Sequence, residues 1–120
     1  MFIPSPTARL GEELACKSLT QKGYKIIDRN FRKGYGEIDI VAVHEDILVF
    51  VEVKTRTTTL YGGAIEAISY SKLKKLTRTC EYYKMLHPKL PQALRIDAIL
   101  IDLENNEVKN IQHIENISGF

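Results

Sequence analysis

The pattern of hydrophobic and polar residues begins with a predicted helix. Ser5 suits the capping position before a helix, Pro6 suits the first helical residue, and Gly23 suits the residue that follows its end. The helix is therefore expected to run from residue 6 to about Lys22.

The rest of the chain predicts three strands, a second helix and two more strands. The near-continuous apolar run at 47–54 is typical of a central strand covered on both faces. Leucine, cysteine and tyrosine recur at spacings of three and four between Leu73 and Tyr83, which indicates the second helix. The other strands are expected at 24–32, 37–43, 94–102 and 108–114, the last being either a strand or a loose tail. This order predicts an α/β fold with an αβββαβ core, in which helices flank a central mixed sheet.

Length and composition agree with an ordinary globular protein. The 120 residues suit one domain, spanning 1–120, and the hydrophobic and charged fractions are 44% and 27%. No apolar run approaches the ~20 residues that cross a membrane, and the N-terminus does not have the pattern of a signal peptide. Cys16 and Cys80 form no CxxC pair, so we expect both to be buried on helices in a reducing cytoplasm.

The net charge of +2 is too small to indicate nucleic-acid binding by itself. Basic residues are nevertheless concentrated in two segments, one at 29–33 and the other at 72–78. Exposed lysines most often serve only as solvated surface, so these segments gain meaning only if another feature indicates a phosphate ligand.

Charged residues interrupt the second and third predicted strands in a regular way. Because side chains alternate along a strand, Glu37 and Asp39 share one face, and Glu52 and Lys54 also share one. In an antiparallel hairpin of the right register, Asp39 lies opposite Glu52 and Glu37 lies opposite Lys54. Opposed residues have Cβ atoms ~5 Å apart, so the four groups would converge on one patch of the sheet.

The register of this hairpin decides whether the patch exists. Pairing of Val43 with Leu48 across a four-residue loop brings Asp39 opposite Glu52. A slip of one residue would place the charges on different faces.

A divalent cation would resolve the repulsion between Asp39 and Glu52 among apolar neighbours. Burying unpaired carboxylates is expensive, whereas Mg²⁺ prefers oxygen ligands and needs only one or two carboxylates. Lys54 would then orient or deprotonate an attacking water, or stabilise charge on a phosphate. The alternative is a solvent-facing sheet on which Glu37 and Lys54 form a cross-strand ion pair.

The first helix offers a further carboxylate. Its face with Ala8, Ala15 and Leu19 also contains Glu12, whereas Glu13 points away from that face. A carboxylate on a buried stripe is unusual without a partner. Glu12 is therefore expected either to reach the same metal site or to pair with a lysine or arginine at the edge of the core.

The two strand motifs resemble the PD-(D/E)XK nuclease signature. Gly36-Glu37-Ile38-Asp39 matches its leading Asp, with Ile38 in place of the usual Pro, and Glu52-Val53-Lys54 matches its E-x-K. Together with Gly11 to Ala15, Gly23-Tyr24, Arg29-Asn30, the block at 50–56 and Arg95-Ile96-Asp97, they resemble the YraN-type family of small bacterial proteins. The resemblance covers nearly the whole chain and implies a restriction endonuclease-like fold, similar to Holliday-junction resolvases.

The resemblance also implies an activity, hydrolysis of DNA phosphodiester bonds, with branched or structured DNA as one possible substrate. Its active-site positions correspond to Glu12, Asp39, Glu52 and Lys54. Asp39, Glu52 and the Val53 carbonyl would hold Mg²⁺ or Mn²⁺, and Lys54 would position the water. Contacts to the DNA backbone, independent of sequence, would come from Arg32, Arg56, Lys72, Lys74, Lys75 and Arg78.

Three points stay open at the level of sequence. The chain is either an active endonuclease, a nucleic-acid-binding module on a nuclease fold without turnover, or a structural protein that uses a sheet edge. Nuclease domains of this size often form homodimers, but no interface signature is visible. Arg95 and Asp97 share a strand face and form either a supporting ion pair near the site or a purely structural one.

Overall fold

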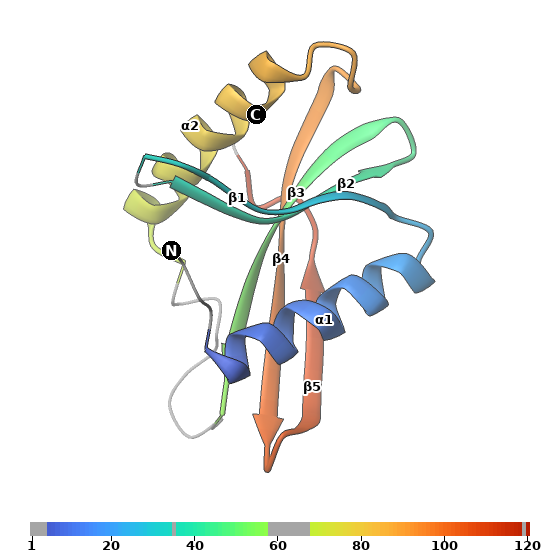
Figure 1. Cartoon of the computed structure of the whole chain (residues 1–120), viewed down its shortest axis with the longest axis vertical. Coiled ribbons are helices and arrows are strands. Elements are labelled where there is room, and N and C mark those ends of the chain that lie inside the picture. Colours follow the sequence, from blue (N-terminus) through green and yellow to red (C-terminus); the bar gives the residue numbers. More distant parts are fainter. Residues whose placement is uncertain (1–4, 35, 58–67, 119) are drawn as a thin grey trace.

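The elements of the fold follow the predicted order. The structure, a computed structural model, describes residues 5–34, 36–57, 68–118 and 120. The elements are α1 (Pro6–Gln21), β1 (Lys25–Lys33), β2 (Gly36–His44), β3 (Ile47–Arg56), α2 (Tyr70–Leu86), β4 (Ala93–Glu104) and β5 (Glu107–Ile114) (Figure 1). The chain thus has an α/β fold with an αβββαβ core, and the final segment is a strand, not a loose tail.

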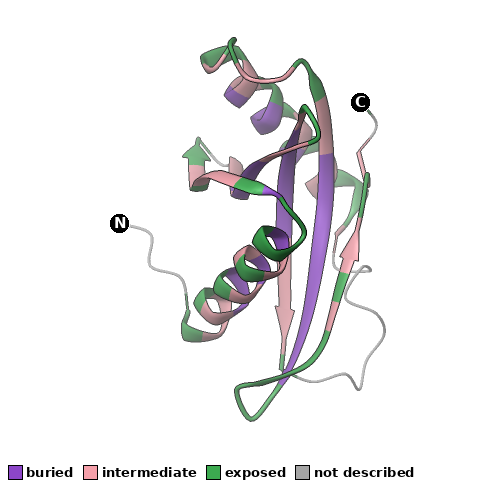
Figure 2. Cartoon of the chain, turned by 90° about the vertical axis from the view of Figure 1, so that its right-hand side faces the viewer, coloured by how far each residue is buried: buried purple, intermediate pink, exposed green. Residues whose placement is uncertain are grey.

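One five-stranded sheet with strand order β1-β2-β3-β4-β5 forms the centre of the molecule. All neighbouring strands are antiparallel except β3 and β4, which are parallel and are connected through α2. The sheet is therefore mixed, as predicted, and this arrangement is compatible with a restriction endonuclease-like core. Burial is greatest along the central strands, whereas edge strand β5 is largely exposed (Figure 2).

The two helices cover opposite faces of the sheet. Alternation along β3 shows this, because Val49 and Val51 pack in the cluster that contains Leu19 of α1. Leu48 and Phe50 pack instead with the α2 residues Leu76, Cys80 and Tyr83. Each face of β3 is therefore buried, which explains why its sequence is almost continuously apolar.

Neither helix in the described part of the chain is long and apolar enough to cross a membrane. Ser5 and Pro6 start α1 as predicted, and the Ser5 hydroxyl accepts a hydrogen bond from the Ala8 amide. Both cysteines lie on helices and are free thiols. Cys80 is fully buried, whereas Cys16 is only half-buried.

The hairpin between β2 and β3 has the predicted register. Val43 pairs with Leu48, and the next pair is His44 with Ile47. The turn thus contains only Glu45 and Asp46, both with positive φ (50° and 61°), instead of the predicted four-residue loop. Two positive φ values in a two-residue turn match the twist of the flanking strands.

Strands β2 and β3 separate before either one ends. Their pairing runs only as far as Ile40 and Val51, although β3 continues to Arg56. Beyond that point the first residues of β2 pair with β1 alone, for example Ile38 with Phe31. The separation opens the sheet next to Asp39 and Glu52.

Two glycines allow both helices to approach this opening. A Cβ on Gly11 of α1 would overlap the Thr55 hydroxyl on β3, and a Cβ on Gly36 of β2 would overlap the Thr79 hydroxyl on α2. Each glycine directly precedes a glutamate, Glu12 or Glu37. The close contacts therefore bring both glutamates to the opening in the sheet.

We expect Gly11→Ala to destabilise the protein by about 1 kcal/mol. Alanine is favoured over glycine within a helix by about 1 kcal/mol, but overpacking against Thr55 costs about 1–3 kcal/mol. Urea unfolding measures the difference. Thr55→Ala removes the overlapping hydroxyl, so Gly11→Ala should stabilise the helix when it is combined with Thr55→Ala. A single Gly11→Ala variant that is more stable than the native protein would contradict the close packing.

Candidate metal centre

The predicted active-site residues meet in a cleft at the opening between β2 and β3. This cleft, here the α1-side cleft, has a volume of about 270 Å³. Its described lining residues are Ser5, Thr7, Ala8, Glu12, Glu37, Asp39, Glu52, Val53, Lys54 and Thr55. A second cleft, here the α2-side cleft, shares Glu37, Asp39 and Glu52 with the first and is otherwise lined by Gly36, Lys72, Lys75 and Leu76.

Asp39 lies at the centre of the opening. One of its carboxylate oxygens accepts a hydrogen bond from the Val53 amide at 2.8 Å, so the side chain bonds β3 where backbone pairing has stopped. Burial raises the pKa of Asp39 to about 8, and the charge of Glu52 adds to this rise, while the Val53 hydrogen bond opposes it. The ionised form of Asp39 is therefore disfavoured near neutral pH unless a cation lies beside it.

Glu12 enters the α1-side cleft from α1 and is only 7% exposed. Burial raises the pKa of its carboxyl group, although a hydrogen bond from Asn30 and the charge of Arg29 counteract the rise. The neighbouring Glu13 points outward and binds Arg29 at 2.8 Å. The two orientations predicted from the helical spacing are thus both observed.

Glu37 does not form the cross-strand ion pair with Lys54 that the sequence left open as an alternative. Its carboxylate binds Arg32 on β1 at 2.9 Å, not Lys54, because Arg32 is directly opposite Glu37 in the β1–β2 pairing. Oxygen atoms of Glu12, Glu37 and Asp39 all lie within 4.8 Å of one another. The sequence brought Glu37 to the charged patch but did not include it among the active-site positions, whereas the structure groups it with Glu12 and Asp39.

Glu52 and Lys54 line the same cleft from β3. The Glu52 side chain is 8% exposed and binds Lys72 of α2 at 2.8 Å. Burial lowers the pKa of Lys54, and the neighbouring Lys72 ammonium group lowers it further. The sequence suggested Lys72 only as a contact to the DNA backbone, because nothing in its spacing showed that α2 would bring it to Glu52.

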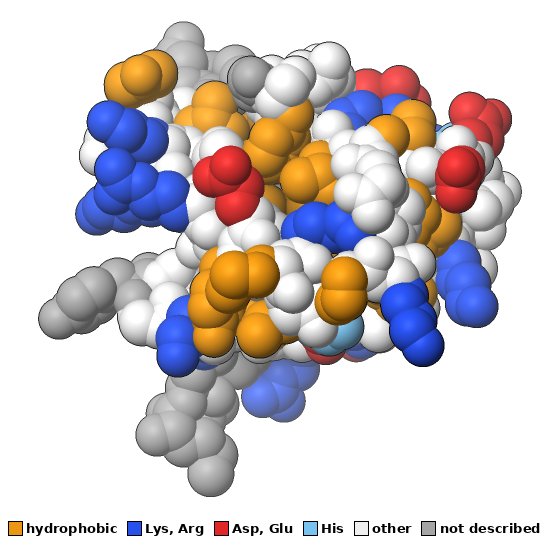
Figure 3. All heavy atoms as spheres, turned by 90° about the horizontal axis from the view of Figure 1, so that it is seen from above, with side chains coloured by type: hydrophobic (Ala, Val, Ile, Leu, Met, Phe, Trp, Pro, Cys, Tyr) orange, Lys and Arg blue, Asp and Glu red, His pale blue; other side chains and the backbone are white. Residues whose placement is uncertain are grey.

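The six basic residues considered for DNA contacts occupy different surroundings. Lys72 and Lys75 line the α2-side cleft, and Arg32 adjoins it through Glu37. Arg56 binds Asp102 on β4 at 2.9 Å, whereas Lys74 and Arg78 lie with Tyr70 and Phe120 along another hollow on α2. On the face seen in Figure 3, basic side chains form separate groups among acidic and apolar ones. Of the six, Lys72 and Arg32 thus contact carboxylates of the clefts directly, and Lys75 lines the α2-side cleft beside them.

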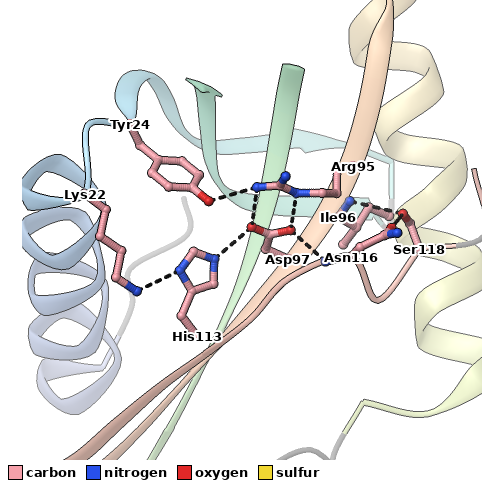
Figure 4. Close-up of polar contacts among 8 residues, drawn as sticks. All are labelled: Lys22, Tyr24, Arg95, Ile96, Asp97, His113, Asn116 and Ser118. Carbon is pink, nitrogen blue, oxygen red and sulfur yellow. Dashed lines mark hydrogen bonds and ion pairs between the residues drawn. The ribbon is translucent and has the colours of Figure 1, made fainter. Parts of the chain in front are cut away.

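Asp97 and Arg95 form the centre of a separate polar network (Figure 4). Asp97 is completely buried and binds Arg95 at 2.8 Å, His113 at 2.8 Å and the Asn116 amide at 2.9 Å. Arg95 also donates to the Tyr24 hydroxyl at 2.8 Å. We call these five residues the Asp97 network. It links β4 to the start of β1, to β5 and to the segment after β5, which agrees with a structural ion pair.

The sequence matches a known protein family over most of its length. The sequence profile described as "Uncharacterised protein family UPF0102" matches residues 11–101. The chain belongs to the UPF0102 family. The matched segment contains Glu12, the two strand motifs and Asp97, so both the candidate metal centre and most of the core lie inside it. The match confirms the resemblance to the YraN-type family as far as family membership is concerned.

The chain is similar to UPF0102 proteins from several bacteria. The protein of Syntrophomonas wolfei is 42% identical over 106 residues, covering 88% of this chain and 91% of that protein. The protein of Chlorobium phaeobacteroides is 37% identical over 120 residues, covering 96% and 95% respectively. That of Leifsonia xyli is 51% identical over 92 residues, covering 76% and 77%. The similarity therefore extends over most of each protein.

We expect Asp39→Asn to stabilise the metal-free protein at pH 8 by about 1.4 kcal/mol or more, the free energy of one pKa unit. The pKa of Asp39 is raised from 3.8 to about 8 on folding, so the folded state holds a proton that the unfolded state releases. The free energy of unfolding should consequently fall as pH rises from about 4 to 8. Thermal unfolding with a chelator, at several pH values, measures this.

Asp97→Asn provides a control, because it should change the free energy of unfolding in the opposite direction from Asp39→Asn. Burial opposes ionisation of Asp97, but hydrogen bonds from His113, Arg95 and Asn116 lower its pKa below the ordinary value. The ionised Asp97 therefore stabilises the folded protein above about pH 4, and this stabilisation is lost as the pH falls below that value. Asp97→Asn should destabilise the protein by about 3 kcal/mol at pH 7. If Asp39→Asn also destabilised the protein at pH 8, the proposed cost of the Asp39 charge would be wrong.

Proposed function

We propose that this UPF0102 protein is a metal-dependent endonuclease that hydrolyses DNA phosphodiester bonds. The observation that supports this best is the meeting of Glu12, Glu37, Asp39 and Glu52 with Lys54 in one cleft. The αβββαβ order and the resemblance of the two strand motifs to PD-(D/E)XK nucleases support the same conclusion. Branched or structured DNA is the substrate class that the resemblance favours.

The donor atoms of the cleft suit Mg²⁺ or Mn²⁺. Carboxylate oxygens are the ligands that hard divalent cations prefer, and no softer ligand is needed. A cation beside Asp39 would also favour its ionised form, which burial and Glu52 now oppose. The hydrogen bond from Val53 fixes one Asp39 oxygen, so the other oxygen would serve the ion.

Two neighbouring sets of oxygens would share Asp39. One is the set inferred from the motif, namely Asp39, Glu52 and the Val53 carbonyl. The other is the group formed by Glu12, Glu37 and Asp39, whose oxygens already lie within 4.8 Å of one another. A bound ion would supply charge stabilisation at a phosphate oxygen and lower the pKa of a bound water.

Lys54 has the properties required next to a nucleophilic water. Its lowered pKa increases the fraction of neutral amine, which can accept a proton, while the ammonium form can orient water or stabilise a phosphate. Glu52 lies two residues before Lys54 on the same face of β3. Lysines 72 and 75 would bind the DNA backbone beside the cleft without reading its sequence.

The decisive experiment is a cleavage assay with branched, flapped and linear DNA in Mg²⁺ or Mn²⁺. We expect the native protein to cut at least one substrate, and Asp39→Ala or Lys54→Ala to reduce the rate by about 100-fold or more. Glu12→Gln and Glu13→Gln form a matched pair on α1. The first should impair cleavage because Glu12 lines the cleft, whereas the second should not, because Glu13 points outward.

Calorimetry with Mn²⁺ separates the metal site from the chemistry. Native protein should bind Mn²⁺, and Asp39→Ala should weaken or abolish that binding. Absence of Mn²⁺ binding by native protein would exclude the metal site. If the protein binds DNA but cuts none of the substrates, and if neither Asp39→Ala nor Lys54→Ala alters this binding, a nucleic-acid-binding module without turnover describes it better.

A further inference from the structure

Lys72 occupies the position at Glu52 where a cation is expected. It lies on α2, far from β3 in sequence, yet its ammonium group is 2.8 Å from a Glu52 oxygen. The Glu52 side chain is 8% exposed, and a nearly buried carboxylate requires a counter-charge. Lys72 supplies that charge.

The position of Lys72 in α2 does not serve the helix itself. Ser69 caps α2 and accepts a hydrogen bond from the Lys72 amide, which makes Lys72 the third residue of the helix. A capping box places Glu or Gln at this position, and the partial positive charge of a helix N-terminus disfavours lysine there. The first turn of α2 contains no acidic residue that would offset this. The interaction with Glu52 therefore explains the lysine better than helix stability does.

Lys72 also lies close enough to Lys54 for its charge to lower the Lys54 pKa. Neighbouring ammonium groups repel each other unless an anion lies beside them, and Glu52, bound to Lys72, provides that anion. A divalent ion on Glu52 would repel Lys72 strongly at this distance. The 41% exposure of the Lys72 side chain and the adjoining α2-side cleft give the side chain room to move away from Glu52.

We propose that Lys72 is a second lysine of the active centre, which holds Glu52 in the metal-free protein and moves to a phosphodiester oxygen when a divalent ion takes Glu52. The inference rests on the proposed function, since it requires a metal at Glu52. It assigns to Lys72 a direct contact with the phosphate that is cut, beside Lys54. The ligand class is a phosphodiester anion, bound between two ammonium groups.

The test is the effect of Lys72→Met on Mn²⁺ affinity, measured by calorimetry without DNA. Removing a competing cation should tighten Mn²⁺ binding roughly fivefold, which corresponds to the strength of a partly exposed ion pair. A lysine that merely positions Glu52 predicts the opposite sign, because its loss would loosen the ligand and weaken binding. Lys72→Gln, whose side chain suits the capping position, keeps the test valid if Lys72→Met unfolds.

Lys75→Met is the matched control for charge in the calorimetric experiment. Lys75 lines the same cleft on the same helix, so its loss changes the net charge equally without removing the contact to Glu52. We expect Lys75→Met to change Mn²⁺ affinity less than Lys72→Met does. Equal effects of the two variants would show that only general charge matters, which would overturn the competition between Lys72 and the metal.

Cleavage at saturating Mn²⁺ tests the phosphate contact. Lys72→Met should then cut DNA about tenfold or more slowly despite its full metal occupancy. Unchanged cleavage would overturn the contact to phosphate. Unchanged or weaker Mn²⁺ binding by Lys72→Met, with normal binding by native protein, would overturn the role of Lys72 while leaving the proposed metal site intact. Absence of Mn²⁺ binding by both would instead exclude the proposed metal site.

Discussion

The candidate centre depends on one hydrogen bond, from the Val53 amide to the Asp39 carboxylate. It forms just beyond Ile40 and Val51, where the two central strands stop pairing. A continuous β-ladder would satisfy the Val53 amide with backbone and close the opening. The side chain of Asp39 takes over this role, so the sheet can open without leaving a buried amide unpaired. The opening, the burial of Asp39 and its raised pKa follow from the same local arrangement.

Asp97 shows how differently the fold treats a second buried aspartate. Arg95, His113 and the Asn116 amide surround Asp97 with donors, so its charge is stabilised although the residue is completely buried. Asp39 has Glu52 nearby and a hydrogen bond from the Val53 amide, and its charge is opposed. Asp97 connects strands through its hydrogen bonds. Asp39 instead lies where its negative charge is unfavourable, and a neighbouring cation would remove that cost. Perturbed carboxyl groups in clefts are frequent at functional sites for this reason.

The sequence predicted the features that depend on local periodicity. Alternation in the strands and the short connection between them determine the hairpin register, and helical spacing determines the inward direction of Glu12. The alternative in which Glu37 pairs with Lys54 required the β2–β3 ladder to continue, and no local pattern shows that the two strands separate beyond Ile40 and Val51. Glu37 binds Arg32 instead, its partner across the β1–β2 hairpin.

The contact of Lys72 with Glu52 was missed for a related reason. It depends on how α2 packs over the sheet, which in turn depends on features such as the contact between Gly36 and Thr79. A glycine in a sequence does not reveal which side chain it accommodates. The contact between Lys72 and Glu52 therefore depends on long-range packing, which helix propensity and residue spacing do not specify. The local feature that hinted at the contact was a lysine in the first turn of a helix, where its charge is unfavourable.

The charges of the cleft bear on the proposed binding of a divalent cation and a phosphodiester. Beside Asp39, the carboxylates of Glu12, Glu37 and Glu52 lie among several cations, which include Arg32, Lys54, Lys72 and Lys75. A divalent ion that displaced the proton of Asp39 would add one net positive charge to the cleft. One phosphodiester group carries a single negative charge, which would offset this gain. Under the proposed function, metal and phosphate would therefore bind more favourably together than either would alone, because each would compensate the charge that the other introduces.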